Sequence, residues 1–151
     1  RDDFYRQNCG ARLQPVLGSI KLHKDLGIWI EITTLVIPSL NDSEEELRNI
    51  AEFIKSVDEG IPWHVSQFYP TYKLQHLPPT PVSTLRRARE IGLEAGLRYV
   101  YQGNVPGEGE DTYCYNCGER LIQRYGYQIV KYGLKGSKCP HCGTDIDGLW
   151  T

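Results

Sequence analysis

Two short cysteine motifs near the end of the chain restrict its folding more than any other feature. They are Cys114-x-x-Cys117 in YCYNCG and Cys139-x-x-Cys142 in KCPHCG, and 21 residues separate them. Four thiolates can surround one metal ion at the corners of a tetrahedron, and a glycine after each pair lets the backbone bend around the sulfurs. The spacing therefore predicts a four-cysteine metal site.

Disulfides or a redox-active dithiol are the alternatives for these cysteines. Lasting disulfides are typical of secreted proteins, and a redox dithiol is expected at the start of a helix in a βαβ unit, so a metal is favoured. Zinc is preferred over a single iron because structural four-cysteine sites usually hold zinc, although the spacing is compatible with both. Four thiolates leave no position for water, so we expect a structural site in which His141 takes no part.

A change of composition after Gly103 predicts where this metal-binding tail begins. The segment GNVPGEGED is rich in glycine and acidic residues, and the stretch that follows it holds four of the five cysteines. We predict a domain boundary near residue 107, with an α/β unit over 1–106 and a zinc-ribbon-like tail over 107–151. A tail of about 40 residues is too short for a large core and is expected to need its metal to fold.

Three helices are predicted in the α/β unit from apolar residues that recur every three or four positions. The first covers residues 14–25, and the second opens with the capping box Ser43-x-x-Glu46. Thr80 is the expected cap of the third helix, which begins at the following proline and ends at Gly96.

Runs rich in β-branched and aromatic residues predict strands at 28–37, 63–69 and 97–102, with a proline-rich surface loop at 71–81. Helix-length connections between short strands favour a parallel sheet with right-handed crossovers. A parallel sheet needs helices on both faces or closure into a barrel, so three strands would leave much apolar surface uncovered. We therefore expect further strands upstream of Arg1, the more so because the chain contains no methionine.

Candidate binding residues of the α/β unit are expected at the carboxyl ends of its strands, where barrels and open sheets collect functional groups. The first place is segment 33–40, beside which Glu31 and Thr33 share a strand face with Trp29. These side chains fit a barrel interior or, equally, a solvated layer. The second place is segment 66–73, whose polar and aromatic residues fit a small-molecule site or the core.

A third segment and four isolated residues complete this set of candidates. The glycines of segment 102–107 free backbone amides for an anionic ligand, and an interdomain hinge explains them equally well. Cys9 has no neighbour at ligand spacing and is expected to be a buried small side chain rather than a nucleophile. His23, His64 and His76 have no partners that the sequence identifies.

Charge and hydropathy argue against two classes of partner. The formal net charge is −2 and the isoelectric point is near 6.1, so the basic excess typical of nucleic-acid-binding proteins is missing. No apolar run approaches the roughly 20 residues of a membrane span, and no signal segment opens the sequence. We expect neither nucleic acid nor membrane as a partner, and the cytoplasm as the location.

Four segments, in order along the chain, resemble a known enzyme family. They are DDFYRQNCGARLQPVL, IWIEITTLVIPSLNDSEEEL, IPWHVSQFYPTYKL and LRYVYQGNVPGEGEDTYCYNCGERLI. Taken together they resemble the radical SAM enzymes of the AmmeMemoRadiSam system, which are relatives of the pyruvate formate-lyase activating enzyme. The resemblance spans practically the whole chain and covers the carboxyl-terminal part of that family.

This resemblance implies the carboxyl-terminal half of a partial (βα)6 barrel, followed by the zinc-ribbon-like tail. An intact member holds a 4Fe-4S cluster on an upstream CxxxCxxC motif. It cleaves S-adenosylmethionine reductively to a 5'-deoxyadenosyl radical, which abstracts hydrogen from a substrate that is unknown here. This sequence lacks that motif, so the chain is expected to be inactive without its partner, the amino-terminal half of the same enzyme.

The resemblance also implies two cofactor contacts. The segment TTLVIP matches the end of the fifth barrel strand, where backbone near Leu35 approaches the adenine of S-adenosylmethionine. Thr33 stands where the activating enzyme has an arginine. Tyr69, at the end of SQFYP, stands where the family often has a histidine near the cofactor.

A binding module is the competing hypothesis. In it the chain is a complete adapter, whose zinc ribbon recognises a protein or nucleic acid and whose α/β unit is a scaffold. The coding sequence upstream of Arg1 distinguishes the two hypotheses, since an in-frame CxxxCxxC supports the enzyme and an immediate start codon supports the adapter.

Overall fold

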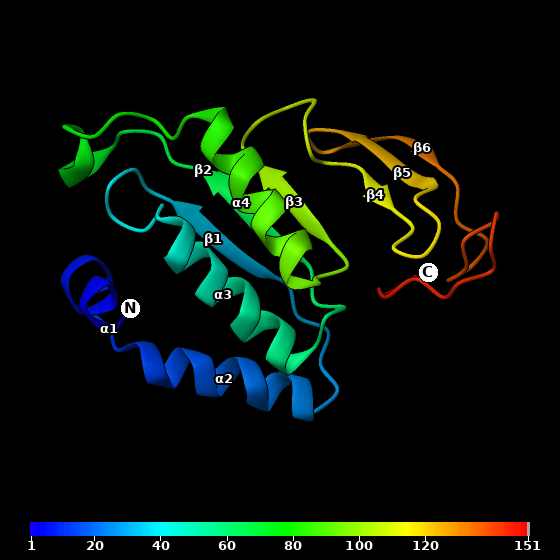
Figure 1. Cartoon of the computed structure of the whole chain (residues 1–151), viewed down its shortest axis with the longest axis horizontal. Helices are drawn as coiled ribbons and strands as arrows, with labels where there is room; N and C mark the ends of the chain where they lie inside the picture. The colour runs from blue at the N-terminus through cyan, green and yellow to red at the C-terminus, as the bar shows by residue number, and fades with distance from the viewer. Residues whose placement is uncertain (151) are drawn as a thin grey trace.

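The computed structural model describes residues 1–150 and contains two three-stranded sheets (Figure 1). The first is parallel, in the order β1-β2-β3, and comprises β1 (Ile32–Val36), β2 (Trp63–Gln67) and β3 (Val100–Gly103). The second is antiparallel, in the order β4-β5-β6, and comprises β4 (Thr112–Tyr113), β5 (Arg120–Tyr125) and β6 (Gln128–Tyr132). The mixed α/β class and the parallel sheet are confirmed.

The three predicted helices are present as α2 (Leu13–Asp25), α3 (Glu44–Val57) and α4 (Val82–Ala95). A short helix α1 (Asp2–Phe4) with a π-helical turn (Tyr5–Cys9) precedes them, and a 3-10 turn (Tyr72–Leu74) lies in the proline-rich loop. As predicted, the hydroxyl of Ser43 accepts a hydrogen bond from the N–H of Glu46 (3.3 Å). Gly96 ends α4 in the left-handed conformation.

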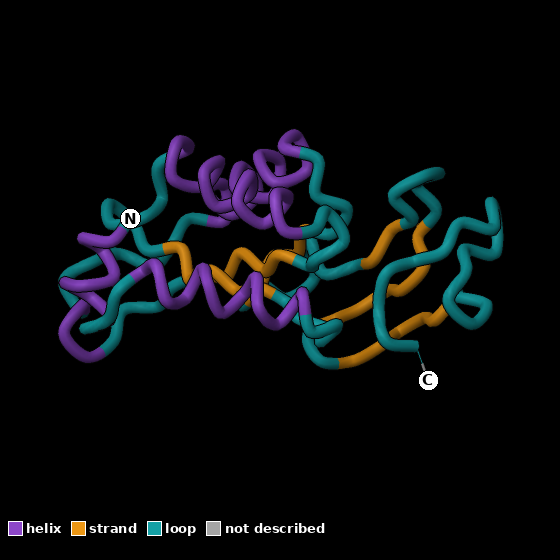
Figure 2. The backbone as a smooth tube through the Cα atoms, turned by 90° about the horizontal axis from the view of Figure 1, so that it is seen from below, coloured by secondary structure: helices purple, strands orange, loops and turns teal. Residues whose placement is uncertain are grey.

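Helices α3 and α4 pack together on one face of the parallel sheet (Figure 2). The strand side chains on this face are buried or partly buried. Among them, the Trp63 indole donates a hydrogen bond to the hydroxyl of Thr34 (2.9 Å). The main core lies between these helices and the sheet. Its buried members are Val36, Leu47, Ala51, Ile54, Ile61, Trp63, Val65, Leu85, Ala88, Ile91, Leu97 and Val100.

The opposite face of the sheet, here called the open face, carries no helix among residues 1–150. Strand register aligns Thr33, His64 and Tyr101 in one row across it, with Leu35, Ser66 and Gly103 in the next. Leu35 is the large aliphatic residue of these rows and is 44% exposed. The expectation of much uncovered apolar surface is therefore wrong, because strand alternation places mainly polar groups on the open face.

All three predicted strands are longer than the observed ones. The strand predicted at 28–37 begins only at Ile32, whose N–H donates to the carbonyl of Pro62 (2.9 Å). Proline has no N–H to offer in return, so the parallel ladder starts there. The strand predicted at 97–102 begins at Val100, because the N–H of Leu97 bonds to the carbonyl of Gly92 in α4 and that of Arg98 to the carbonyl of Glu59.

Thr80 does not cap α4 as predicted. Pro81 is the N-cap residue and makes no side-chain cap, while the buried hydroxyl of Thr80 donates to the carbonyl of Val36 (2.5 Å). The same hydroxyl accepts from the N–H of Phe68 (2.9 Å), which ends β2 at Gln67 rather than at residue 69. Thr80 thus joins the ends of two strands to the start of the helix.

The antiparallel sheet packs on a second, smaller core. Its buried members are Tyr99, Cys114, Leu121, Ile122, Leu134, Cys139 and Ile146. Tyr99 comes from the α/β unit, so this core joins the two sheets. All residues of β6, the edge strand, are exposed. Among residues 1–150, no helix is long and apolar enough to cross a lipid bilayer.

Candidate functional site

The two cysteine motifs fold into matching turns. In the first, the N–H of Gly118 donates to the carbonyl of Cys114 (2.9 Å), and in the second the N–H of Gly143 donates to that of Cys139 (2.9 Å). Both glycines have a φ of 75°, in the left-handed region that glycine tolerates. Each turn presents two sulfurs toward the other turn.

The four sulfurs converge on one point. All four Sγ atoms lie within 4.8 Å of one another, with 3.6 Å between Cys114 and Cys142 and 3.7 Å between Cys117 and Cys139. A disulfide needs about 2.05 Å, and all four residues are free thiols, so the disulfide alternative does not match. Four sulfurs at about 2.3 Å from a central zinc would lie about 3.8 Å apart. The cluster can therefore bind one tetrahedral metal ion such as zinc.

The thiols of the cluster differ in acidity. Hydrogen bonds with the side chain and the backbone of Thr144 lower the pKa of Cys142 to about 5. The backbone N–H of Glu119 lowers the pKa of Cys117, but burial and the neighbouring thiols outweigh it and raise the pKa to about 12. A bound cation would stabilise all four thiolates, which suits this donor set to a metal.

His141 and Cys9 both lie outside the four-cysteine group. His141 lies inside the second motif, is exposed and does not belong to the four-cysteine group, as predicted. Cys9 is exposed, so its predicted burial is wrong. The reason is local, because the π-helical turn that contains Cys9 buries no residue.

The end of the tail is anchored to the α/β unit by Asp147. Its carboxylate accepts hydrogen bonds from the guanidinium of Arg98 (2.9 Å) and the hydroxyl of Tyr99 (3.1 Å). Arg98 also lies over the ring of Tyr115, 4.3 Å from its centroid. Burial raises the pKa of Tyr99 above its ordinary value, so its hydroxyl stays protonated and can donate.

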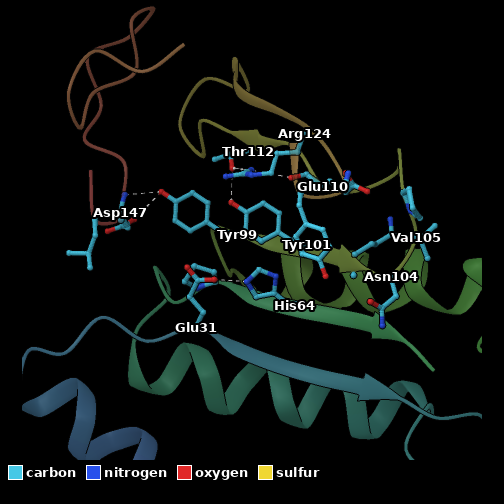
Figure 3. Close-up of a pocket in the computed structure, with 18 of the residues that line it drawn as sticks. Glu31, His64, Tyr99, Tyr101, Asn104, Val105, Glu110, Thr112, Arg124 and Asp147 are labelled. Atoms are coloured by element: carbon cyan, nitrogen blue, oxygen red, sulfur yellow. Dashed lines mark hydrogen bonds and ion pairs between the residues drawn. The ribbon is translucent and has the colours of Figure 1, made fainter. Parts of the chain in front are cut away.

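A cavity of about 920 Å³, here called the sheet–tail cavity, lies between the open face and the antiparallel sheet (Figure 3). Its floor includes Glu31, His64 and Tyr101 from the α/β unit. Its opposite wall comes from the tail and includes Thr112 and Arg124.

Glu31 and His64 form a pair on the floor of this cavity. The Nε2 atom of His64 lies 2.7 Å from the Oε2 atom of Glu31. The Oε1 atom of Glu31 accepts a hydrogen bond from the indole of Trp29 (3.1 Å). The pKa of Glu31 lies below its ordinary value, first because of the hydrogen bond with His64, although burial opposes this. The ring of His64 lies 5.2 Å from that of Tyr101, at an angle of 30°.

Tyr101 connects the floor to the tail wall. Its hydroxyl is 2.9 Å from that of Thr112, which accepts a hydrogen bond from Arg124 (2.6 Å). Arg124 also donates to the carbonyl of Glu110 (3.1 Å), and its guanidinium lies 5.7 Å from the centroid of the Tyr101 ring. Burial raises the pKa of Tyr101, so the phenol is neutral at physiological pH.

The structure separates the two residues that the resemblance places near S-adenosylmethionine. Tyr69 lines the cavity, is 56% exposed and donates from its hydroxyl to the carbonyl of Asn104 (3.3 Å). Leu35 is exposed on the open face and does not line the cavity. Its carbonyl accepts a hydrogen bond from Asn41 (3.0 Å). Thr33 is exposed in the row of His64.

The other candidate segments divide between cavity and core. In segment 66–73, Phe68 is buried, whereas Tyr72 is 78% exposed. Most of segment 102–107 lines the cavity, and Asn104 there adopts a positive φ of 63° while donating to the carbonyl of Gln67 (3.0 Å).

Sequence reasoning missed two groups of this cavity. The partner of His64 is Glu31, 33 residues earlier, and aligning the two predicted strands in parallel would have placed both on one face. Arg124 carries no local signal, because only the docking of the tail brings it to the open face. His23, another histidine candidate, does not line the cavity, and its ring forms a hydrogen bond with the carbonyl of Ser19 (2.7 Å).

Comparisons with known proteins give a relationship rather than a function. No protein-family model matches the chain. The chain is 48% identical over 149 residues to the uncharacterized protein MJ0808 of Methanocaldococcus jannaschii. The match covers 96% of this chain and 45% of MJ0808, so the chain spans less than half the length of that relative.

Proposed function

We propose that the chain is the carboxyl-terminal part of a radical SAM enzyme that resembles the pyruvate formate-lyase activating enzyme. In this proposal, residues 1–106 supply later βα units of a partial (βα)6 barrel, and the tail supplies a zinc ribbon. One observation carries the proposal, namely the one-sided parallel sheet with its polar open face. A segment of barrel wall has this form, with helices outside and alternate strand residues facing a shared interior.

Two further observations support this proposal. The relative MJ0808 is more than twice as long as the aligned region, so a longer polypeptide that contains a region similar to this chain exists in at least one organism. The family resemblance places a 4Fe-4S cluster on cysteines upstream of this sequence. Among residues 1–150, the tail cysteines are the one group with the geometry to hold a metal.

The residues of this chain would act on S-adenosylmethionine by binding rather than by chemistry. When bound to its cluster, this cofactor supplies the 5'-deoxyadenosyl radical. The backbone near Leu35 fits an adenine contact, because Leu35 is 44% exposed on the open face. The hydrogen bond from Asn41 fixes the main chain there. Tyr69 offers a phenol that is held at the end of β2 by its bond to Asn104.

The enzyme proposal is tested on the longer polypeptide that contains this sequence. After anaerobic reconstitution with iron and sulfide, it should show the electron paramagnetic resonance signal of a reduced 4Fe-4S cluster. It should also release 5'-deoxyadenosine from S-adenosylmethionine with dithionite. Replacing one cysteine of the upstream CxxxCxxC motif should abolish both signals. A coding sequence without that motif, or a reconstituted protein that releases no 5'-deoxyadenosine, would refute the proposal.

The zinc site is tested separately on this chain. Elemental analysis of the purified protein should find about one zinc per chain, and Co²⁺ substitution should give the absorption of a tetrahedral thiolate site. Cys117→Ser should lower the metal content, whereas Cys9→Ser is a matched control that leaves it unchanged, since Cys9 is exposed and outside the cluster. Iron in place of zinc would correct the identity of the metal. Disulfides among the four cysteines would overturn the site.

A further inference from the structure

The sheet–tail cavity has the dimensions of a ligand site and lies apart from the cysteine cluster. Its volume of about 920 Å³ is within the range of small-molecule pockets, about 300–1,000 Å³. Two structural units form its walls, and domain interfaces are a preferred position for such sites. The zinc site and the adenine contact proposed at Leu35 lie outside it, whereas Tyr69, the second proposed cofactor contact, lines it.

Arg124 supplies a fixed positive charge in this cavity. Its Nη1 atom is held by the carbonyl of Glu110 and the hydroxyl of Thr112, both of which are uncharged acceptors. Among residues 1–150, Arg124 forms no ion pair, and the two hydrogen bonds that hold its guanidinium both come from Nη1. A half-buried guanidinium with two free donors is suited to a bidentate bond with a carboxylate.

Aromatic rings line this cavity. Tyr101 lies beneath the guanidinium and beside the ring of His64, and Trp29, Tyr127 and Trp150 line other parts of the cavity. Such walls favour a flat aromatic body, which gains stacking and buries apolar area.

The charges around the cavity select the charge of the ligand. Of the three acidic residues that line it, Asp147 is neutralised by Arg98, while Glu31 and Glu110 keep the interior from being strongly positive. A monoanion can pair with the guanidinium, whereas a phosphate dianion would place a second negative charge near the two carboxylates.

We propose that the sheet–tail cavity binds a small aromatic carboxylate, with the carboxylate on Arg124 and the ring among the aromatic walls. His64, fixed by Glu31, contacts the ring from the floor. This inference depends on the cavity and not on radical chemistry, so its test and the test of the enzyme proposal can fail independently.

The experiment compares three probes that share one ring system, 2-naphthoate, 2-naphthalenemethanol and 2-naphthyl phosphate. Calorimetric titration into the metal-loaded chain should show that naphthoate binds about tenfold or more tightly than the neutral alcohol, and more tightly than the phosphate. Arg124→Gln should reduce naphthoate affinity about tenfold. Arg120→Gln is the matched control, because Arg120 lies on the same strand, pairs with Asp111 and does not line the cavity.

The metal content and circular dichroism of each variant establish whether it is folded. Arg124→Lys is a second test variant, since it keeps the positive charge but loses the planar guanidinium that can bind a carboxylate with two donors. It should bind naphthoate with intermediate affinity. Absence of naphthoate binding, equal affinity for the alcohol, tighter binding of the phosphate, or equal effects of Arg124→Gln and Arg120→Gln would each overturn the proposal.

Discussion

Tyr99 and Asp147 exchange two hydrogen bonds across the contact between the α/β unit and the tail. The Tyr99 hydroxyl donates to the carboxylate of Asp147 (3.1 Å) and accepts from its backbone N–H (3.1 Å). Asp147 lies five residues after Cys142, so the second cysteine turn determines where it can stand. Metal binding and tail docking are therefore structurally connected, and the sheet–tail cavity depends on both.

Tyr99→Phe should weaken this docking. The variant keeps the ring but leaves a partly buried N–H and a carboxylate oxygen without one partner, so the free energy of unfolding should fall by about 1–3 kcal/mol. Urea denaturation of the metal-loaded protein measures this change. Tyr127→Phe is the control, because Tyr127 is fully exposed and should have no effect. A double-mutant cycle with Asp147→Asn that shows no coupling energy would contradict the contact.

Gly92→Ala should destabilise the α/β unit even though alanine favours helices. A Cβ at this position would lie 2.8 Å from a methyl group of Val100 and 2.9 Å from the Trp63 ring. Such overpacking costs about 1–3 kcal/mol. Replacing glycine by alanine in a helix gains only about 1 kcal/mol, so the cost of overpacking prevails over most of that range. Gly18→Ala in α2 is the matched control, since open space surrounds it, and should raise stability by about 0.5–1 kcal/mol. Thermal unfolding that shifts both variants in one direction would disprove the close packing.

Thr80→Val should destabilise the fold by about 1–3 kcal/mol, because it keeps the shape of the side chain but removes two buried hydrogen bonds. The carbonyl of Val36 and the N–H of Phe68 would lose their partner. Thr71→Val is the control at an exposed position in the same loop. Equal unfolding free energies for the two variants would mean that Thr80 does not join the strand ends.

The pKa of Glu31 should rise toward its ordinary value in His64→Phe, which removes the hydrogen-bonding nitrogen but keeps a ring beside Tyr101. Because the folded-state pKa is lowered, the pair stabilises the fold above the ordinary glutamate pKa of about 4.3, and this stabilisation disappears as the pH falls through the lowered value. Carbon-13 NMR titration of the carboxyl group measures the shift. His23→Phe should leave Glu31 unchanged, and an unchanged titration in His64→Phe would show that the pair does not form.

Local signals in the sequence predicted the helices well. The cap at Ser43 and the stop at Gly96 depend on residues within one helical turn, so they are visible without tertiary information. Strand ends were less predictable, because Pro62 limits β1 from a distance of 30 residues. The expected capping role of Thr80 failed for the same reason, since its hydroxyl is used by two other segments.

The candidate sites also differ in whether local or long-range contacts form them. Spacing alone located the four cysteines, because each pair is a local turn and two turns suffice for the cluster. The pair of Glu31 and His64 required the register of a parallel sheet, and the position of Arg124 required the docking of the tail on the open face. Groups that depend on such long-range contacts cannot be found from spacing.

The free edge of the antiparallel sheet has a consequence for handling the protein. Strand β6 exposes Ile129 and Val130, each 59% accessible, and its outer N–H and C=O groups have no neighbouring strand among residues 1–150. Such an edge is a template for pairing with another chain, and a lysine is a common natural defence. Lys131 is the one charged residue of the strand, so we expect its loss to make this edge more prone to pair with another chain.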